Sequence, residues 1–379
     1  MTLMLASVAD AEEAALVARL GADIVDFKDP SRGAIAAVEP EIARAGVSAV
    51  AGMALTSATL GDPPYATESL IARAHAFREA GVDMLKLAVD GPALAALSPS
   101  LAEIARGGAL IGMLFADENP DFELLAQLQT LGFSGAMLDT RRKGEGRLID
   151  HLDLARLATF SARCRALGLT AGLAGSLEPP DIPRLLLTGA DALGFRGALC
   201  AGRQRGAGID REAAALVRDL IPRERREDAP NVDWRLLGRG LVGADEPESD
   251  LDRIFVRDFV VQTEIGAYDF ERGHKQRVAF DVEALVRRTG AEPRDMRAIF
   301  SYDVILDAIR IVAAQGHHEF VEGLAEAVAA MILRHERARQ VKIVARKLDV
   351  IDGAVGVEIV RRRAAAAVAP GPLHQRLGR

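Results

Sequence analysis

The chain has 379 residues and a formal net charge of -7 at pH 7; 49% of the residues are hydrophobic and only 4% are aromatic. This length exceeds the roughly 100 to 200 residues of one ordinary domain, so we expect two domains. An acidic chain lacks the basic face of a general nucleic-acid-binding protein, which excludes that class but leaves room for local basic pockets that hold phosphorylated small molecules.

Neither the cysteines nor the apolar runs indicate export. Cys164 and Cys200 are too few for a disulfide scaffold and lack metal-ligand spacing. The N-terminal residues lack a secretory signal, and no apolar run reaches the roughly 18 residues of a membrane span. His317 and His318 are adjacent and the other histidines are scattered, so we expect no metal. The prediction is a cytoplasmic protein that binds neither membrane nor nucleic acid.

Residues 1–221 alternate short apolar runs with segments of helical spacing. Eight runs are predicted as strands, at residues 3–8, 23–28, 48–55, 83–88, 110–115, 135–139, 170–174 and 190–195. Helical spacing is clear at residues 10–20, 66–80, 122–131, 152–167 and 178–187. Eight such units in one domain favour a closed (β/α)8 barrel. The alternative is an open doubly wound sheet, but no Gly-x-Gly-x-x-Gly turn follows the first strand.

A lysine ends the second apolar run, IVDFK at residues 24–28, and another interrupts the fourth, MLKLA at residues 84–88. A cation in such a run costs desolvation free energy unless it faces a cleft or a partner. Active groups of a barrel lie at the carboxyl ends of its strands. Reading those positions gives the candidate set: Asp26 and Lys28; Ser57, Thr59 and Asp62; Lys86; Asp139 and Lys143; Gly175 and Ser176; Arg196 and Gly197.

Two kinds of chemistry are indicated at this rim. The turns after the seventh and eighth strands, with Gly175, Ser176, Arg196 and Gly197, predict phosphate binding, although plain turn glycines are the alternative. Any single strand-end lysine is more often solvated or ion-paired. Three lysines at one rim with Asp26 and Asp139 instead favour an amine of lowered pKa that attacks a carbonyl, which is Schiff-base chemistry.

With these motifs assembled, residues 1–220 resemble the (5-formylfuran-3-yl)methyl phosphate synthase family. The matching segments are ADIVDFKDP at 22–30, SATLGDPPY at 57–65, DMLK at 83–86, AMLDT at 136–140, LAGSL at 173–177 and RGA at 196–198. The resemblance implies a cofactor-free condensation of two glyceraldehyde 3-phosphate molecules for methanofuran or methylofuran synthesis. It implies Lys28 as the Schiff-base residue, Lys86 as general acid/base, and Asp139 with Lys143 in proton transfer and dehydration.

One segment departs from the family pattern, because two extra arginines, Arg141 and Arg142, follow Asp139. They form either a second phosphate clamp or a solvated loop. A different phosphosugar for a Schiff-base aldolase is a further alternative, since this fold hosts many chemistries.

Charge runs with Pro and Gly predict a linker at residues 222–250, which includes Trp234. Residues 251–363 follow the order two strands (253–263 and 277–286), two helices (303–314 and 319–335), two strands (341–347 and 354–360). This order predicts an α+β domain with an antiparallel sheet, whose open edges favour a homo-oligomer. Residues 364–379 are predicted to be a disordered tail.

The second domain resembles the dihydroneopterin aldolase family of the tunnelling fold. The matching segments are IGAYDFER at 265–272, FSYDVI at 300–305, VEGLAE at 321–326 and KIVARK at 342–347, followed by GVEI at 356–359. The resemblance implies acid/base roles for Glu271, Tyr302 and Lys347, and a contact of Glu322 with the amide edge of a dihydroneopterin-like pterin. The lysine commonly precedes a proline in that family, and here Leu348 follows it. The alternative is a domain that only holds subunits together.

Overall fold

The computed structural model describes residues 2–30, 32–33, 36–61, 64–223, 251–268, 271–288 and 296–363. These residues form two compact units, one made of residues 2–223 and 296–299 and the other of residues 251–288 and 300–363 with their gaps. The predicted linker beyond residue 223, with Trp234, and the predicted tail at 364–379 lie outside the described residues.

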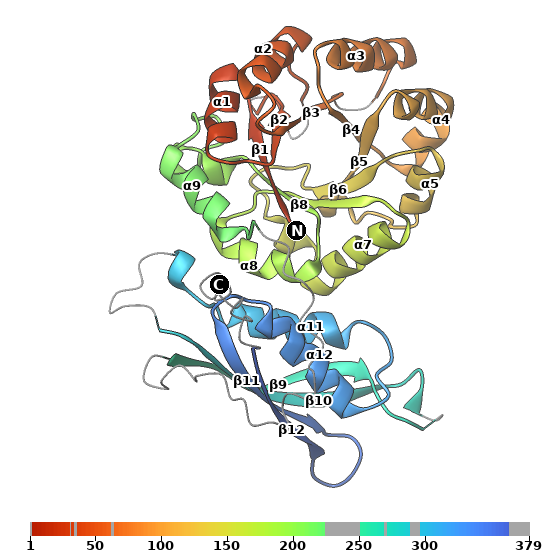
Figure 1. The fold of residues 1–379 in the computed structure, drawn as a ribbon. Coiled ribbons are helices and arrows are strands. Elements are labelled where there is room, and N and C mark those ends of the chain that lie inside the picture. Colours follow the sequence, from red (N-terminus) through yellow and green to blue (C-terminus); the bar gives the residue numbers. More distant parts are fainter. Residues whose placement is uncertain are drawn as a thin grey trace, which may run out of the picture. The chain divides into compact units, whose positions relative to one another are not determined.

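In the described part of the first unit, eight parallel strands close a barrel in chain order, which confirms the predicted (β/α)8 fold. The strands are β1 (Leu3–Val8), β2 (Ile24–Phe27), β3 (Leu55–Thr59), β4 (Met84–Ala88), β5 (Ala109–Phe115), β6 (Gly135–Asp139), β7 (Thr170–Leu173) and β8 (Ala192–Phe195). Helices ring them (Figure 1): α1 (Ala11–Arg19), α2 (Pro40–Val50), α3 (Thr67–Glu79), α4 (Gly91–Arg106), α5 (Leu124–Thr130), α6 (Leu148–His151), α7 (Leu154–Ala166), α8 (Ile182–Leu185) and α9 (Arg211–Leu220).

The predicted third strand, residues 48–55, is wrong. Helix α2 runs to Val50 and ends at Ala51, which has a left-handed φ of 51°. The helix buries Ala43, Gly46 and Val50, so the start of the apolar run belongs to a helical face, and residues 51–54 form the turn that follows. The strand follows at Leu55–Thr59, and Ser57 and Thr59 therefore lie within β3 instead of in the loop after it.

The parallel register of the first four strands aligns their polar residues. Ser7 on β1 pairs with Asp26 on β2, Asp26 pairs with Ser57 on β3, and Thr59 pairs with Lys86 on β4. A buried apolar cluster that includes Leu5, Ile24, Met113 and Met137 fills the barrel. Because residues paired in a parallel register, and those two positions further along, point to the same side of the sheet, these polar groups face the same side.

In the described part of the second unit, a four-stranded antiparallel sheet has the order β12-β11-β10-β9. Its strands are β9 (Leu251–Glu264), β10 (Lys275–Arg287), β11 (Ala338–Lys347) and β12 (Val355–Arg362), and helices α11 (Asp303–Ala313) and α12 (Val321–Leu333) lie against one face (Figure 1). Alternate residues Val278, Phe280 and Val282 of β10 are fully buried beneath these helices. The predicted α+β arrangement is confirmed. None of the helices in the described ranges has the length and hydropathy needed to cross a membrane.

The contact between Gly46 and Phe27 offers a test of the barrel packing. Phe27 is fully buried, and a Cβ on Gly46 would lie 2.2 Å from its Cε1 atom. We expect Gly46→Ala to lower the free energy of unfolding by about 1–3 kcal/mol, since neither the ring nor the helix has room to move. Urea unfolding followed by circular dichroism measures this.

The control is Gly91→Ala in α4, where the nearest atom to an added Cβ, Leu124 Cδ2, lies at 3.8 Å. Equal unfolding midpoints for the two variants would contradict the packing described here.

Candidate active site

Asp26 is fully buried at the carboxyl end of β2 and is held from three other strands. Its carboxylate accepts hydrogen bonds from the hydroxyls of Ser7 (3.1 Å) and Ser57 (2.7 Å), and it forms an ion pair with Nζ of Lys86 at 2.6 Å. Burial alone would raise the pKa of Asp26, but Lys86, Lys28 and the hydrogen bonds outweigh it, so the pKa lies below its ordinary value. Asp26 is therefore ionised although it is buried.

A second carboxylate–lysine pair follows β6. Nζ of Lys143 lies 2.5 Å from Oδ1 of Asp139 and 3.2 Å from the Thr140 hydroxyl. The Thr140 amide also donates to the Asp139 carboxylate, at 2.8 Å. Burial again opposes ionisation, but Lys143 and Lys28 hold the pKa of Asp139 below its ordinary value. This pair is compact enough to pass a proton to or from a bound molecule.

Lys28 lies between these two pairs and forms no ion pair with any described residue. Its side chain is 8% exposed. Burial lowers the pKa of Lys28 to about 8 from the ordinary 10.5, while Asp139 and Asp26 oppose the shift and the cations of Lys86 and Lys143 add to it. A large share of this amine is thus neutral near pH 8, which is the form that attacks a carbonyl carbon.

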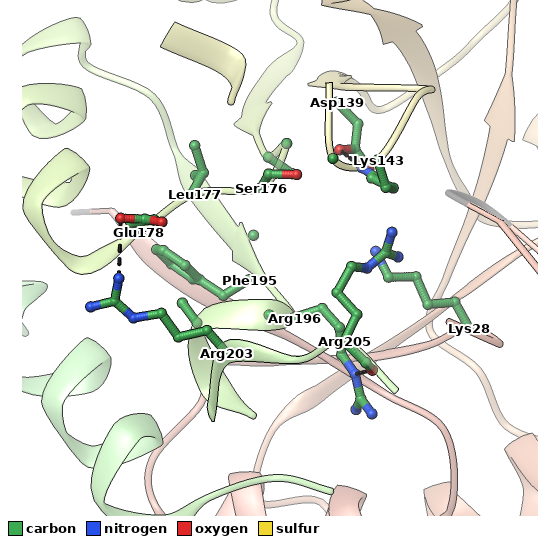
Figure 2. Close-up of a pocket in the computed structure, with 16 residues that line it drawn as sticks. Lys28, Asp139, Lys143, Ser176, Leu177, Glu178, Phe195, Arg196, Arg203 and Arg205 are labelled. Carbon is green, nitrogen blue, oxygen red and sulfur yellow. Dashed lines mark hydrogen bonds and ion pairs between the residues drawn. The ribbon is translucent and has the colours of Figure 1, made fainter. Parts of the chain in front are cut away.

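A cavity of about 240 Å³ opens beside Lys28, Asp139 and Lys143 (Figure 2). Its other wall is the turn at Gly175 and Ser176, which have φ values of 123° and 51°. A Cβ on Gly175 would lie 3.1 Å from the Thr140 backbone nitrogen, so only glycine lets this turn pack against the segment after β6. The predicted glycine turns thus line the same cavity as the lysines, and Gly197 lines it as well.

Arg196 also lines the cavity, but its guanidinium is engaged elsewhere. It donates to the Glu13 carboxylate on α1, with an Nη1–Oε2 distance of 2.5 Å, and to the carbonyl oxygens of Ser7, Arg205 and Ala207. Those contacts use Nε and both terminal nitrogens, so we assign no phosphate contact to Arg196. Its role is to hold the segment around residues 205–207 against the barrel.

The extra arginines after Asp139 have local partners too. Arg141 pairs with Glu118 at 2.6 Å and lies over the Phe115 ring, and Arg142 pairs with Asp117 and Glu145. The backbone amides of both arginines donate to the Asp117 carboxylate. These contacts favour the interpretation of Arg141 and Arg142 as loop residues over that of a second phosphate clamp.

Of the remaining predicted residues, Ser57 and Thr59 are buried on β3, and Thr59 Oγ1 accepts from the Gly61 amide at 3.3 Å. Asp62 lies outside the described residues. Sequence reasoning missed Ser7 and Arg205. Ser7 could have been found from its place near the end of the first strand, whereas nothing local to Arg205 marks it.

In the second unit, Glu271 and Lys347 form an ion pair. Nζ of Lys347 and Nε2 of Gln276 each lie 2.8 Å from Oε1 of Glu271, and the Tyr268 amide donates to Oε2 at 3.1 Å. The hydrogen bond from Lys347 is the main reason why the pKa of Glu271 falls to about 2. A Cβ on Gly266 would lie 2.0 Å from the Glu271 carboxylate, so glycine is required there.

The other two predicted residues of this unit stand apart from that pair. Tyr302 is 59% exposed before α11, and Glu322 is exposed in the first turn of α12. Neither side chain contacts Glu271 or Lys347 among the described hydrogen bonds. The residue that replaces the expected proline, Leu348, donates its amide to the Arg277 carbonyl at 3.0 Å, a bond that proline could not make.

In the part of the chain that the structure describes, no three His, Cys, Asp or Glu side chains gather as metal ligands would. The fold and these side chains define a (β/α)8 barrel with a lysine–carboxylate site at the carboxyl ends of its strands, joined to an α+β unit with its own lysine–carboxylate pair.

The chain belongs to the 4-HFC-P synthase family, whose model matches residues 4–218. The dihydroneopterin aldolase model matches residues 254–360. Both resemblances inferred from the motifs are confirmed.

Several known proteins are similar to parts of this chain. A Methylorubrum extorquens protein, named as a candidate (5-formylfuran-3-yl)methyl phosphate synthase, is 43% identical over 227 residues, which cover 60% of this chain and 94% of the relative. The (5-formylfuran-3-yl)methyl phosphate synthase of Methanothermobacter thermautotrophicus is 32% identical over 235 residues, or 58% of this chain and 98% of the relative. A solved E. coli dihydroneopterin aldolase in complex with neopterin is 30% identical and covers 29% of this chain and 98% of its own, with a TM-score of 0.28.

The lowered pKa of Lys28 predicts a specific pH dependence. Because the neutral amine reacts and its population rises as pH passes through the pKa, labelling of Lys28 by an amine reagent should reach half its maximal rate near pH 8. Asp139→Asn removes a carboxylate that favours the charged amine, so the midpoint should move to lower pH. Peptide mass spectrometry of timed labelling measures both.

Glu68→Gln, an exposed change in α3, is the control and should leave the midpoint unchanged. A midpoint near pH 10.5 in the unaltered protein would contradict the site described here.

Proposed function

We propose that the first unit condenses two molecules of glyceraldehyde 3-phosphate into (5-formylfuran-3-yl)methyl phosphate through an imine on Lys28. The observation that carries this proposal is the buried Lys28 amine, which forms no ion pair with a described residue and lies within the field of two carboxylate–lysine pairs, beside a cavity with glycine turns. The family assignment and the names of the relatives support the same reaction. The product class would serve methanofuran or methylofuran synthesis.

The steps use groups that the structure brings together. The neutral Lys28 amine attacks the aldehyde carbon, and loss of water gives the imine. The iminium acidifies the adjacent C–H, so a nearby base can remove that proton and generate the carbon nucleophile that attacks the second aldehyde. Lys86 acts as general acid/base, and the Asp139–Lys143 pair donates and accepts protons as water and one phosphate group leave. Hydrolysis of the last imine frees Lys28.

Substrate binding is assigned to the polar residues around these groups. Gly175, Ser176 and Gly197 present backbone amides to a phosphate, as the corresponding turns of this fold commonly do. Asp26, with Ser57 and Thr59, holds the lysines in place and faces the hydroxyl groups of the substrate. Lyase-type aldol chemistry follows from this arrangement.

For the second unit we propose a dihydroneopterin aldolase-like activity, supported by the Glu271–Lys347 pair and by the family model. Glu271 and Lys347 would exchange protons with the pterin, Tyr302 would assist, and Glu322 would accept hydrogen bonds from the amide edge of the ring. A pterin and a furan precursor both lead to one-carbon carriers, which gives the fusion a metabolic purpose.

The second candidate function is an oligomerisation module without activity. The observation that favours it is the exposed apolar surface on the outer strands, with Phe255 57%, Val260 46% and Val360 44% exposed. A homo-oligomer and a cytoplasmic location stay predictions under either reading. A barrel that acts on another phosphosugar is the remaining alternative, and mass spectrometry of the product separates it from the furan synthase.

Borohydride trapping tests the first activity. Glyceraldehyde 3-phosphate followed by borohydride should leave a stable mass adduct on Lys28, because reduction fixes the imine to that amine. Lys28→Ala should abolish the adduct and turnover, whereas Lys275→Ala, an exposed lysine of β10, should keep both. An adduct that maps to another lysine, or none at all, would refute the assignment.

Release of glycolaldehyde from dihydroneopterin tests the second activity. We expect Lys347→Ala to lower kcat by about 10²- to 10⁴-fold, the usual contribution of a general acid/base group. Lys342→Ala on the same strand, whose side chain pairs with Glu358, is the matched control. Wild-type protein that assembles into oligomers but releases no glycolaldehyde would favour the oligomerisation module.

A further inference from the structure

The cations that line the barrel cavity differ in whether they have a partner. In the described part of the chain these cations are Lys28, Lys143, Arg196, Arg203 and Arg205. Three of them are paired: Lys143 with Asp139, Arg196 with Glu13, and Arg203 with Glu178. Lys28 and Arg205 form no ion pair with any described residue. Since Lys28 is the amine proposed to react, Arg205 is the cation in this cavity that has neither an ionic partner nor an assigned role.

Arg205 is held by its backbone, which leaves its side chain available. Arg196 Nε donates to the Arg205 carbonyl at 3.0 Å, and Arg196 Nη2 donates to the Ala207 carbonyl at 3.1 Å. Arg196 is itself anchored to Glu13 on α1, so the segment is tied to the barrel wall. The guanidinium of Arg205 donates one hydrogen bond to a described residue, and it is a long one, 3.5 Å from Nη2 to the Gly33 carbonyl.

The side chain of Arg205 extends toward the reacting end of the cavity. Figure 2 draws Arg205 and Lys28 on one side of the cavity and Leu177 and Glu178 on the other. The Asp139 carboxylate is also close enough to act on the charge of the Arg205 guanidinium. Gly197 packs next to the Arg205 side chain, since a Cβ at that position would lie 3.4 Å from Arg205 Cγ, an ordinary van der Waals distance. The Gly175–Ser176 turn and Arg205 therefore contact different parts of the cavity.

Among the described residues, the charges around Lys28 do not balance without a bound anion. The pairs Lys86–Asp26 and Lys143–Asp139 are each neutral as units. Arg205 adds a permanent positive charge, since arginine keeps its proton in proteins even where burial lowers its pKa, as it does here. A partly buried cation without a counterion is costly unless a ligand supplies the negative charge.

We propose that Arg205 binds the phosphate group of the aldehyde that forms the imine with Lys28, and so makes this step selective for phosphorylated aldehydes. The inference rests on the proposed function, because it concerns the same reaction at Lys28. A guanidinium suits this task, since its planar N–H groups donate two parallel hydrogen bonds to phosphate oxygens. The Gly175–Ser176 turn then serves the phosphate of the other substrate molecule.

The test compares imine formation by a phosphorylated and an unphosphorylated aldehyde in the full-length protein. Borohydride trapping on Lys28 is measured against the concentration of glyceraldehyde 3-phosphate and of glyceraldehyde. We expect Arg205→Gln to raise the half-saturating concentration of glyceraldehyde 3-phosphate about 10- to 100-fold, the effect of losing a charged hydrogen-bond pair. Trapping by glyceraldehyde should change less than about threefold, which also shows that the variant is folded.

Arg203→Gln is the matched control, because Arg203 lines the same cavity but is exposed and paired with Glu178. It should leave both aldehydes unaffected, and Arg205→Lys should recover part of the selectivity. If Arg205→Gln weakens the two aldehydes equally, or neither of them, the proposal is overturned.

Binding of inorganic phosphate separates this inference from the proposed function. Phosphate should raise the Tm of the wild-type protein and of Arg203→Gln, and should raise that of Arg205→Gln much less. This outcome supports Arg205 as an anion-binding residue even if glyceraldehyde 3-phosphate leaves no adduct on Lys28, in which case only the proposed function fails. Equal stabilisation of wild type and Arg205→Gln overturns the proposal.

Discussion

The ion pair between Asp26 and Lys86 is the interaction on which the barrel site depends. A carboxylate with no exposed surface is costly to bury, and it persists here because Lys86 and the hydroxyls of Ser7 and Ser57 satisfy it. These partners come from β1, β3 and β4, so one charge ties four strands to a common register. The same carboxylate faces Lys28 and limits how far burial can lower the pKa of that lysine. Asp26 therefore contributes both to the register of the strands and to the pKa of Lys28.

Both units contain carboxylate–lysine pairs, but the pairs differ in their surroundings. In the barrel, the carboxylate–lysine pairs act on a third lysine, Lys28, which has no ion-pair partner among the described residues and a pKa lowered to about 8. In the second unit, Lys347 donates directly to Glu271, which lowers the pKa of that carboxyl group. The first arrangement suits a nucleophilic amine, and the second suits a pair that exchanges a proton with a ligand. This difference follows mainly from the burial of Lys28, which lowers its pKa, and from the direct hydrogen bond of Lys347 to Glu271.

In the loops after the barrel strands, some arginines stabilise the backbone and another reaches the cavity. The place of Arg196 after β8 predicts a phosphate ligand. Its guanidinium instead donates to Glu13 and to three carbonyl groups. Its effect is to fix the backbone of Arg205, whose side chain reaches the cavity. Arg141 and Arg142 likewise stabilise their own loop through Glu118 and Asp117. The role of a basic residue near a site can thus be assigned only when its hydrogen-bond and ion-pair partners are known.

The sequence by itself determined the two fold classes, both families, and the positions of Lys28, Lys86 and Asp139 on or next to barrel strands, because alternating periodicity and ordered motifs are local properties. It misplaced the third strand, since residues 48–50 end helix α2, whose buried face at Ala43, Gly46 and Val50 is recognised only once the helix is seen to pack on the barrel. Tertiary structure alone decided which cations are paired. Ion pairing depends on distances between residues such as Arg196 and Glu13, 183 positions apart in the chain, and no spacing within the sequence encodes them.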